Sequence, residues 1–580
     1  MQENRPSRPA NNIRKEKRMS SKKALHTTTT SEPETLVADN LSETAVPIPP
    51  ASGATPASRS SRKAGNSLRA SVAVVSGRAA GAVSRRLHLG GGTSITGVIA
   101  QRLYPDIVTH LSSQLQQGSI LVTGTNGKTT TSGFIAAMLS DAGLRVWRNR
   151  EGSNLMRGIA GALVIRTQPN GKLRRSGQAV SIFEVDEAVI PQAVKTIPTR
   201  MIVFTNLFRD QLDRYGEVDS VLERWQRTIS TLSPETILVL NADDPTIAGL
   251  GEHFAGRVIY FGMEDSSLDL ESQEGNAERY QVMDTRTCAK CGSEYTYTLR
   301  FYSHIGHYTC PNCGYSRPQT QVRATKVTSD DFDRLRIQVE TPGQQGEITI
   351  PLPGLYNIYN ALAAIATAHA LELAWTPIVS GIEQFKPAFG RGESVQVAGR
   401  TIRMLLAKNP TGFNEVLRTL FSDGKKRHVL FVLNDNTADG KDISWIWDVD
   451  FEQTSGNLAA LTIAGTRARD LALRMKYAGV APQDIVVVPA SPLHGERGQA
   501  KPARPRRVTN KLPFGEHETT KDGALPQKTY GIAQALDRAL SSTPEGETLF
   551  IVPTYTGLLE IHRELEHRGL IPRYWEETGP

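Results

Sequence analysis

The chain has 580 residues, of which 39% are hydrophobic, so it can form two or three domains with a large core. No apolar run approaches the roughly 18 residues of a membrane span, and the first residues lack the apolar segment of a secretory signal. We therefore expect a cytoplasmic protein without a transmembrane segment. Residues 1–90 hold 15 Lys and Arg against 6 Asp and Glu, whereas the rest of the chain holds 52 against 53. This near-neutral remainder argues against nucleic acid as a partner, because binding to a phosphate backbone needs clustered cations on the folded surface.

Two segments of low complexity are predicted. Residues 1–70 are basic and rich in Thr, Ser, Pro and Ala, which is typical of a disordered tail. Weak attraction to an anionic membrane surface is an alternative role for this tail. Residues 68–88 mix small apolar residues with Arg and predict a short amphipathic helix packed on the body of the protein. Residues 491–527, rich in Pro, Lys and Arg, predict an exposed insertion in the last domain.

The segment 120–131, Ile-Leu-Val-Thr-Gly-Thr-Asn-Gly-Lys-Thr-Thr-Thr, predicts a strand, a phosphate-binding loop and a helix in that order. Small residues let backbone N–H groups face an anion, and the start of the following helix adds its positive dipole end. Lys128 would reach the outer phosphates, and Thr129 or Thr130 would hold Mg²⁺. Val122 stands where the common G-x-x-x-x-G-K-[ST] loop has its first Gly, so the loop is a variant. The residues expected to bind nucleotide are Gly124, Thr125, Asn126, Gly127, Lys128, Thr129 and Thr130.

Three further predicted strands each end in polar side chains (residues 179–184, 200–205 and 236–240). The first ends at Glu184, the best candidate for a catalytic Mg²⁺ ligand beside the loop, with Asp186 or Glu187 behind it. The third leads into Asp243 and Asp244. A single Asp in such a place commonly caps a helix, but the repeated placement favours ligand binding. Strand ends of this kind are typical of the ligand edge of a doubly wound, mostly parallel sheet.

All four cysteines fall in two Cys-x-x-Cys pairs, Cys288 with Cys291 and Cys310 with Cys313. This spacing predicts a closed structural zinc site in a ribbon over residues 284–318, since four thiolates leave no open position for a substrate. Two disulfides are the alternative, which a cytoplasmic location disfavours. No cysteine remains as a nucleophile. If glutamine is the nitrogen donor, a partner must therefore release its ammonia.

Several of these motifs resemble the central domain of Mur ligases, ATP-dependent enzymes that join amino acids to cell-wall precursors and are related to folylpolyglutamate synthases. The similar stretches are TGTNGKTT, the strand with Glu184, TNLFRDQLDR, NADDP and LYNIYNALAA at 355–364. The resemblance implies a Mur ligase-type α/β domain over residues 71–395, with a helical lead-in. It also implies nucleotide contacts from Asn357, Asn360 and Arg391. The shared chemistry is activation of a carboxylate as an acyl phosphate, followed by attack of an amine.

The cysteine ribbon and residues 433–452 (LNDNTADGKDISWIWDVDFE) narrow the resemblance to the MurT family, the synthetase subunits of lipid II isoglutaminyl synthases. It implies a C-terminal α/β domain over residues 396–580 that contacts a class I glutaminase subunit, GatD. It further implies that the α-carboxylate of D-glutamate in the lipid II stem peptide is amidated to D-isoglutamine at the inner face of the cell membrane. The reaction would consume ATP and glutamine-derived ammonia and would require Mg²⁺ as a cofactor.

By motif position, Asp442 would complete the Cys-His pair of the partner glutaminase and orient its His. A turn-forming Asp is the alternative, and without the resemblance Asp439 would be an equal choice. Lys408 in Lys-Asn-Pro-Thr-Gly is a further candidate for contact with the intermediate, or it lies in a surface loop. The alternative function is that of a stand-alone amino-acid ligase of the folylpolyglutamate synthase type, which the ribbon and the Asp442 segment disfavour.

Overall fold

A computed structural model describes most of the chain, in the ranges 63–86, 93–149, 154–174, 176, 179–210, 218–270, 283–387, 390–490 and 531–571. The predicted insertion 491–527 and residues 1–62 of the predicted tail lie outside the described residues. Within these ranges, no helix combines the length and the apolar character needed to cross a membrane.

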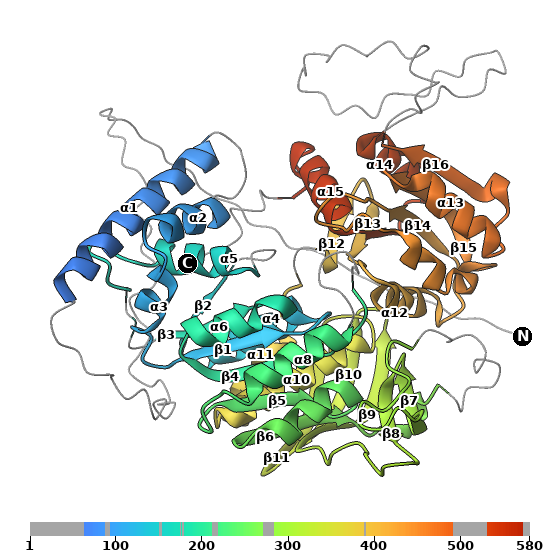
Figure 1. The fold of residues 1–580 in the computed structure, drawn as a ribbon. Coiled ribbons are helices and arrows are strands. Elements are labelled where there is room, and N and C mark those ends of the chain that lie inside the picture. The colour runs from blue at the N-terminus through green and yellow to red at the C-terminus, as the bar shows by residue number, and fades with distance from the viewer. Residues whose placement is uncertain are drawn as a thin grey trace, which may run out of the picture. The chain divides into compact units, whose positions relative to one another are not determined.

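The larger sheet has nine strands in the order β11-β10-β9-β6-β5-β4-β1-β3-β2 (Figure 1). Neighbouring strands from β2 to β9 in this order pair in parallel, and β10 and β11 add two antiparallel pairings at one edge. The strands are β1 (Ser119–Thr123), β2 (Arg145–Arg148), β3 (Ala179–Glu184), β4 (Thr199–Phe204), β5 (Ile237–Asn241), β6 (Arg257–Met263), β9 (Val322–Asp331), β10 (Arg334–Thr341) and β11 (Gln344–Ile350). The mostly parallel sheet expected from the polar strand ends is confirmed.

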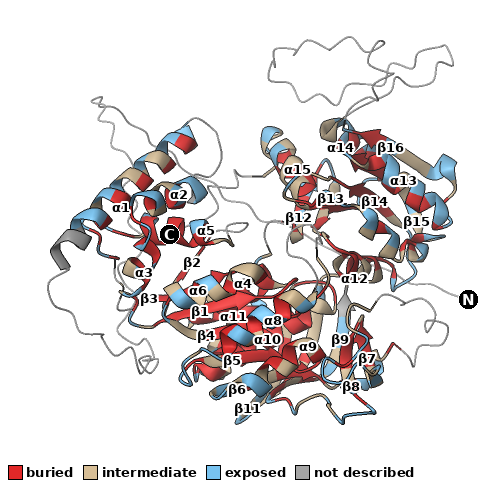
Figure 2. Cartoon of the chain, in the orientation of Figure 1, coloured by how far each residue is buried: buried red, intermediate tan, exposed pale blue. Residues whose placement is uncertain are grey.

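Helices cover both faces of this sheet, and the side-chain alternation of β1 shows why. Ile120 and Val122 enter a core with Phe134, while Leu121 enters a second core with Trp225 on the opposite face. Both faces of the strand are therefore apolar, as expected for a parallel sheet that is buried on two sides (Figure 2). The first core takes α4 (Lys128–Asp141), α10 (Tyr356–Ala370) and α11 (Trp375–Glu383); the second takes α5 (Met156–Ile165), α6 (Ile190–Thr196), α8 (Val218–Ile229) and α9 (Pro245–Ala248).

Three helices precede the phosphate loop: α1 (Lys63–Arg86), α2 (Thr93–Leu103) and α3 (Ile107–Ser112). The helix expected from residue 68 onward thus begins at Lys63 and takes in the last residues of the range 1–70. Glycines bring these helices close together. A Cβ on Gly77 of α1 would lie 2.8 Å from the Thr96 carbonyl oxygen of α2, and one on Gly97 would lie 1.7 Å from that of Arg157 in α5.

The C-terminal part forms a second sheet of six strands in the order β12-β13-β17-β14-β15-β16, parallel except for β12. Its strands are β12 (Arg391–Val397), β13 (Arg400–Leu405), β14 (Arg427–Val432), β15 (Leu458–Gly465), β16 (Ile485–Pro489) and β17 (Thr548–Pro553). One face packs on α12 (Pro410–Phe421) and α13 (Ala468–Tyr477), and the other on α14 (Ile532–Ser541) and α15 (Tyr555–His567). The predicted C-terminal α/β fold is confirmed.

The pH dependence of this domain's stability is expected to involve Asp450. Burial and the neighbouring carboxylate of Glu452 raise the pKa of Asp450 to about 7. A carboxyl whose pKa is raised by folding loses a proton more readily in the unfolded chain, so stability falls as pH rises from about 4 to about 7. Asp450→Asn should remove this loss and raise the free energy of unfolding by about 1–2 kcal/mol at pH 8, with little change at pH 4. Asp484→Asn, an exposed control in the same domain, should change neither value in denaturant titrations; equal effects of both variants would contradict the assignment.

Candidate functional site

The loop between β1 and α4 is held in shape by two glycines and by the end of β4. Gly124 and Gly127 have φ of 131° and 86°, and a Cβ on either would lie within 2.2 Å of a side-chain oxygen of Thr205 or Asn360. The Asn126 backbone N–H donates to Asn206 Oδ1 at 2.9 Å, and Thr205 Oγ1 donates to the Asn126 carbonyl at 2.8 Å. The predicted order of strand, loop and helix is therefore confirmed, and the loop lies at the positively polarised start of α4.

Lys128 lies under this loop and is almost fully buried. Its Nζ donates to the Gly124 carbonyl at 2.5 Å and forms an ion pair with Glu187 Oε1 at 3.0 Å. Burial opposes the charge, but the carboxylates of Glu187, Asp186 and Asp210 outweigh it and raise the pKa of Lys128. The ammonium group is thus charged at neutral pH and lies beside the loop where an anion would bind.

Glu184, at the end of β3, faces the first turn of α4. Thr129 Oγ1 donates to Glu184 Oε2 at 2.7 Å, and Ser132 Oγ donates to Oε1 at 2.7 Å. Arg148 of β2 also approaches Oε1, at 3.4 Å. The structure therefore brings together the two predicted Mg²⁺ ligands, Thr129 and Glu184, whose hydroxyl and carboxylate oxygens suit that ion.

A pocket opens beside the loop and extends to the start of the C-terminal part. Arg391 lines it. Its Nη2 donates to Thr129 Oγ1 at 2.8 Å, while its buried Nε has no hydrogen-bond partner among the described residues. Asn360 Nδ2 donates to Asn357 Oδ1 at 2.9 Å. The predicted nucleotide-binding residues on the pocket wall are Asn126, Gly127, Thr130, Asn357, Asn360 and Arg391. These groups fit a nucleotide, because they offer amide and guanidinium donors next to the phosphate loop.

Lys408 and Asn409 connect the C-terminal part to the loop. Lys408 Nζ forms an ion pair with Asp210 Oδ2 at 2.8 Å, and Asn409 Nδ2 donates to Asn126 Oδ1 at 3.1 Å. Burial of Asp210 is outweighed by the adjacent Lys408 ammonium, which lowers the pKa of the carboxyl. The segment is thus at the loop rather than on a remote surface.

Asp243 and Asp244 differ from the expectation that they serve at the ligand edge. Asp244 caps the start of α9 by accepting from the N–H groups of Thr246 and Ile247. Asp243 is fully buried and accepts from Arg317 Nε at 2.5 Å, Tyr359 Oη at 2.7 Å and the Met263 N–H at 2.8 Å. Both carboxylates are occupied by protein donors, so their role is structural.

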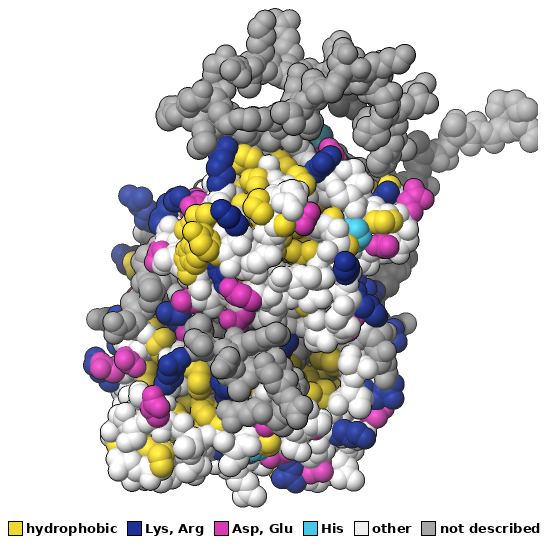
Figure 3. Space-filling model, turned by 90° about the vertical axis from the view of Figure 1, so that its right-hand side faces the viewer, with side chains coloured by type: hydrophobic (Ala, Val, Ile, Leu, Met, Phe, Trp, Pro, Cys, Tyr) yellow, Lys and Arg dark blue, Asp and Glu magenta, His cyan; other side chains and the backbone are white. Residues whose placement is uncertain are grey.

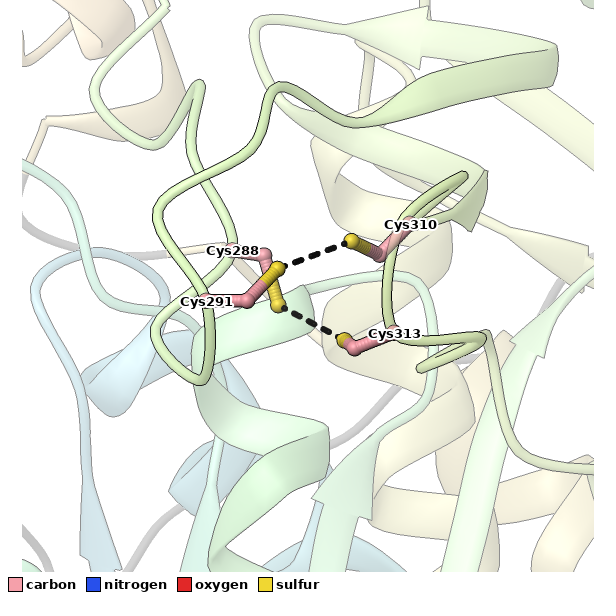
Figure 4. A group of neighbouring side chains, drawn as sticks. All are labelled: Cys288, Cys291, Cys310 and Cys313. Atoms are coloured by element: carbon pink, nitrogen blue, oxygen red, sulfur yellow. Dashed lines mark hydrogen bonds between the residues drawn. The ribbon is translucent and has the colours of Figure 1, made fainter.

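The four cysteines gather in one cluster whose Sγ atoms all lie within 4.8 Å of one another. The Sγ atoms of Cys288 and Cys313 are 3.6 Å apart, and those of Cys291 and Cys310 are 3.4 Å apart (Figure 4). A tetrahedral site with metal–sulfur bonds of about 2.3 Å has edges of about 3.8 Å, so the cluster fits a metal ion.

The two turns of the cluster are alike. Gly292 and Gly314 both have φ of 75°, and each N–H donates to the carbonyl of the first cysteine of its turn. Between them lie the antiparallel strands β7 (Thr296–Tyr302) and β8 (Ile305–Thr309), which form the predicted ribbon. The side chain of the nearby His307 donates to the Met263 carbonyl at 2.7 Å, so its Nε2 is occupied by a partner outside the cysteine cluster.

Asp442 lies in the segment before the short 3₁₀ helix Ser444–Asp448. Its side chain is exposed and accepts from the Ser444 N–H at 2.8 Å, which holds the pKa of the carboxyl below its usual value. Asp439 is buried and accepts from the backbone N–H and the hydroxyl of Thr556. The structure thus separates the two aspartates: Asp439 joins two parts of the domain, whereas Asp442 has an ionised carboxylate open to solvent.

The polar and charged residues around the phosphate loop, which include Lys128, Thr129 and Glu184, are called the loop cluster below. Sequence reasoning missed three of its members: Ser132, Arg148 and Asp210. Ser132 follows Thr129 by three residues, so helical spacing could have placed both hydroxyls on one face of α4. Arg148 ends β2 as Glu184 ends β3, and only the pairing of those strands brings them together. Asp210 gains its role from Lys408, which is distant in sequence.

Comparisons with known proteins agree with this geometry. Residues 122–313 match the Mur ligase middle domain, and residues 406–496 match the MurT ligase C-terminal domain. The MurT subunit of lipid II isoglutaminyl synthase (glutamine-hydrolyzing) from Staphylococcus aureus strain COL is 35% identical, over 68% of this chain and 85% of that one. The Streptococcus pneumoniae subunit of the same name is 31% identical, over 72% and 89%.

A solved pseudomurein peptide ligase type C from Methanothermus fervidus shares the fold, with a TM-score of 0.54 and 22% identity over 78% of this chain and 79% of that one. The identity and coverage of the two MurT subunits are sufficient to assign the family. The chain is a ligase that belongs to the MurT family of Mur ligase-like enzymes.

Proposed function

We propose that this ligase converts the α-carboxylate of D-glutamate in the lipid II stem peptide into the amide of D-isoglutamine, at the inner face of the cell membrane. A carboxylate oxygen attacks the γ-phosphorus of ATP and ADP leaves. Ammonia then attacks the acyl carbon and phosphate leaves, so that one C–N bond replaces one C–O bond. The MurT relatives carry the name of this activity.

The loop cluster supports the first step. Lys128 and Arg391 would hold the phosphates, Asn357 and Asn360 would contact the nucleoside, and Thr129 with Glu184 would hold Mg²⁺. The metal would neutralise charge on the transferred phosphoryl group. Because Lys128 is already fixed by Glu187 and the Gly124 carbonyl, its charge needs little reorganisation during the reaction.

The cysteine cluster is the observation that points to a separate protein as the source of ammonia. The chain has four cysteines, and all four lie in the cluster, so no thiol is left to attack glutamine. We therefore propose a separate class I glutaminase of the GatD type as the partner, with Asp442 orienting the partner's His. The exposed, ionised carboxylate of Asp442 supports this role.

The surface near Asp442 also supports a protein partner. Trp447, Leu473 and Tyr477 expose 51, 49 and 67% of their area, and the rings of Trp447 and Tyr477 lie 5.8 Å apart. Figure 3 views the side on which α13 and β16 lie and shows hydrophobic side chains gathered in its upper part. Exposed aromatic groups of this size are typical of protein interfaces.

The experiment that tests the proposal compares the chain with and without a co-expressed GatD-type glutaminase. Amidation of lipid II is followed by mass spectrometry with glutamine or with ammonium as the nitrogen source. We expect ATP-dependent amidation by the chain alone at high ammonium, and glutamine use only with the partner. Addition of an amino acid to a substrate, with no amidation from either source, would contradict the proposal and favour the stand-alone ligase.

We propose zinc as the metal of the four-cysteine cluster, with a purely structural role. Replacing the buried Cys310 with Ser should lower the free energy of unfolding by about 3 kcal/mol or more, because metal binding contributes directly to folding. Thermal unfolding with and without a chelator, together with metal analysis, checks this. Lys290→Ala, at an exposed position in the other Cys-x-x-Cys turn, should keep the metal and cost at most about 1 kcal/mol. A metal-free protein with no titratable thiols would show disulfides instead.

A further inference from the structure

The N-terminal helices have an unusual distribution of large apolar side chains. Among the described residues, twelve large hydrophobic side chains are exposed, and seven of these lie on α1 and α2. They are Leu68, Val72, Val75 and Val83 of α1 and Ile95, Val98 and Leu103 of α2. Such a concentration on two helices calls for a specific explanation, since single exposed hydrophobic residues are ordinary but clusters are not.

Along α1 the exposed apolar residues follow helical spacing. Positions 68, 72, 75, 79 and 83 are all exposed, and steps of three and four residues place them on one side of the helix. Leu68, Val72, Val75 and Val83 expose 70, 50, 51 and 56% of their area. This face is called the α1 stripe below.

The opposite side of α1 is made of smaller residues. Ala70, Ala73 and Gly77 are buried against α2 and α5, where Gly77 allows close approach of the Thr96 carbonyl and the side chain of Ala100. The helix therefore directs its small side chains into the protein and most of its branched side chains outward, the reverse of an ordinary surface helix. Fold stability alone does not require this arrangement, because the inner face already holds the helix.

The charged residues of the two helices themselves are all of one sign. α1 contains five Lys and Arg and no Asp or Glu, and α2 contains Arg102 and no acidic residue. Arg69 and Arg78 fall on either side of the stripe by helical spacing. The Arg69 side chain is exposed, whereas the half-buried Arg78 also donates to the Thr167 carbonyl at 3.1 Å. Basic residues flanking an apolar face fit an anionic lipid surface, where the apolar side chains enter the acyl boundary and the cations meet the headgroups.

We propose that the exposed face of α1 and α2 docks the protein on an anionic membrane surface. Docking itself does not rest on the proposed reaction. Its use would be to place the phosphate loop near a lipid-linked substrate, which does rest on it.

Vesicle sedimentation of the full chain tests the docking. Phosphatidylglycerol vesicles are compared with phosphatidylcholine vesicles at low salt and at about 0.5 M NaCl, where electrostatic attraction is largely screened. We expect binding to the anionic vesicles, and a part of it that persists at high salt. The double variant Val72→Asp/Val75→Asp should lower the salt-resistant partition coefficient about tenfold or more, because apolar burial is lost.

The matched control is Leu473→Asp/Tyr477→Asp on α13, which places the same charges on exposed apolar residues of the other domain. It should bind vesicles like the unaltered chain, and thermal unfolding should show that both variants are folded. Equal vesicle binding by the stripe variant and the unaltered chain at high salt would overturn the proposal. If light scattering shows a dimer of the unaltered chain that the stripe variant does not form, and neither of these two proteins binds vesicles, the face would be assigned to a second copy. New protease cuts within residues 1–62 of the variant would instead assign it to the tail.

An activity measurement separates docking from the reaction. With ammonium as the nitrogen source, the stripe variant should show a raised KM for lipid II in anionic vesicles and an unchanged kcat for a water-soluble short-chain analogue. Vesicle binding without amidation by the unaltered chain would contradict the proposed reaction and leave docking in place. Amidation with no vesicle binding would do the opposite.

Discussion

Lys128→Ala is expected to lower ATP-dependent amidation about a hundredfold or more with either nitrogen source, because both routes share the phosphoryl-transfer step. Lys128 is the buried cation under the phosphate loop, where the Gly124 carbonyl and the Glu187 carboxylate hold its ammonium group. Initial rates with saturating ammonium, and with glutamine plus the partner, measure the effect. Full retention of either rate would contradict the assignment of the loop.

Loss of the cation also leaves Glu187 buried without its ion pair, which alone could destabilise the fold by about 3 kcal/mol. A second variant separates the two effects. Lys128→Met/Glu187→Gln removes both charges and should restore much of the thermal stability without restoring amidation. Lys290→Ala, which removes an exposed ammonium group from the cysteine ribbon, should keep the rate near that of the unaltered chain. Recovery of activity in the double variant would show that Lys128 matters only for folding.

Asp442→Asn is expected to lower the rate of glutamine-dependent amidation about a hundredfold or more. The rate of ammonium-driven amidation should stay unchanged. The amide keeps the size and the bond from the Ser444 N–H, but it cannot stabilise a positively charged imidazole on a partner. Rates with glutamine and with ammonium, both in the presence of the glutaminase, give the comparison. Loss of both rates would contradict the role assigned to Asp442.

Two control measurements distinguish a role of Asp442 in glutamine use from a loss of folding or of complex formation. The complex of the variant with the glutaminase should still elute as one species, since a single exposed carboxylate is a small part of an interface. Asp439→Asn provides the contrast: Asp439 is buried and joins the segment to Thr556, so its change should lower thermal stability and reduce both activities together. A variant of Asp442 that behaves like Asp439→Asn would indicate a structural role for both.

The parts of the site that sequence predicted well are those built from neighbours in the chain. The phosphate loop, Glu184 at the end of β3 and the two Cys-x-x-Cys turns each depend on a few consecutive residues whose conformations are locally determined. Glycine at positive φ after β1 is one such local requirement, and the sequence shows it directly.

The parts that sequence could not predict depend on contacts between distant segments. Asp243 looked like a ligand because it follows a strand, yet Arg317 and Tyr359, more than 70 residues away, neutralise and occupy it. The pairing of Lys408 with Asp210 depends on how β13 leads into α12. Without the resemblance to MurT subunits, the local sequence does not distinguish Asp442 from Asp439, because burial and the contact with Thr556 separate the two carboxylates only in the fold.

The contacts of Asp243 make the cysteine ribbon a poor candidate for simple excision. Arg317 comes from the end of the ribbon, and Tyr359 precedes Asn360 on α10. One buried carboxylate therefore joins the ribbon to the helix that lines the pocket beside the loop. A shortened chain with a loop in place of residues 284–318 would leave that carboxylate without its counter-ion. Such a design, or a natural relative without the ribbon, would need an uncharged residue at position 243 as well.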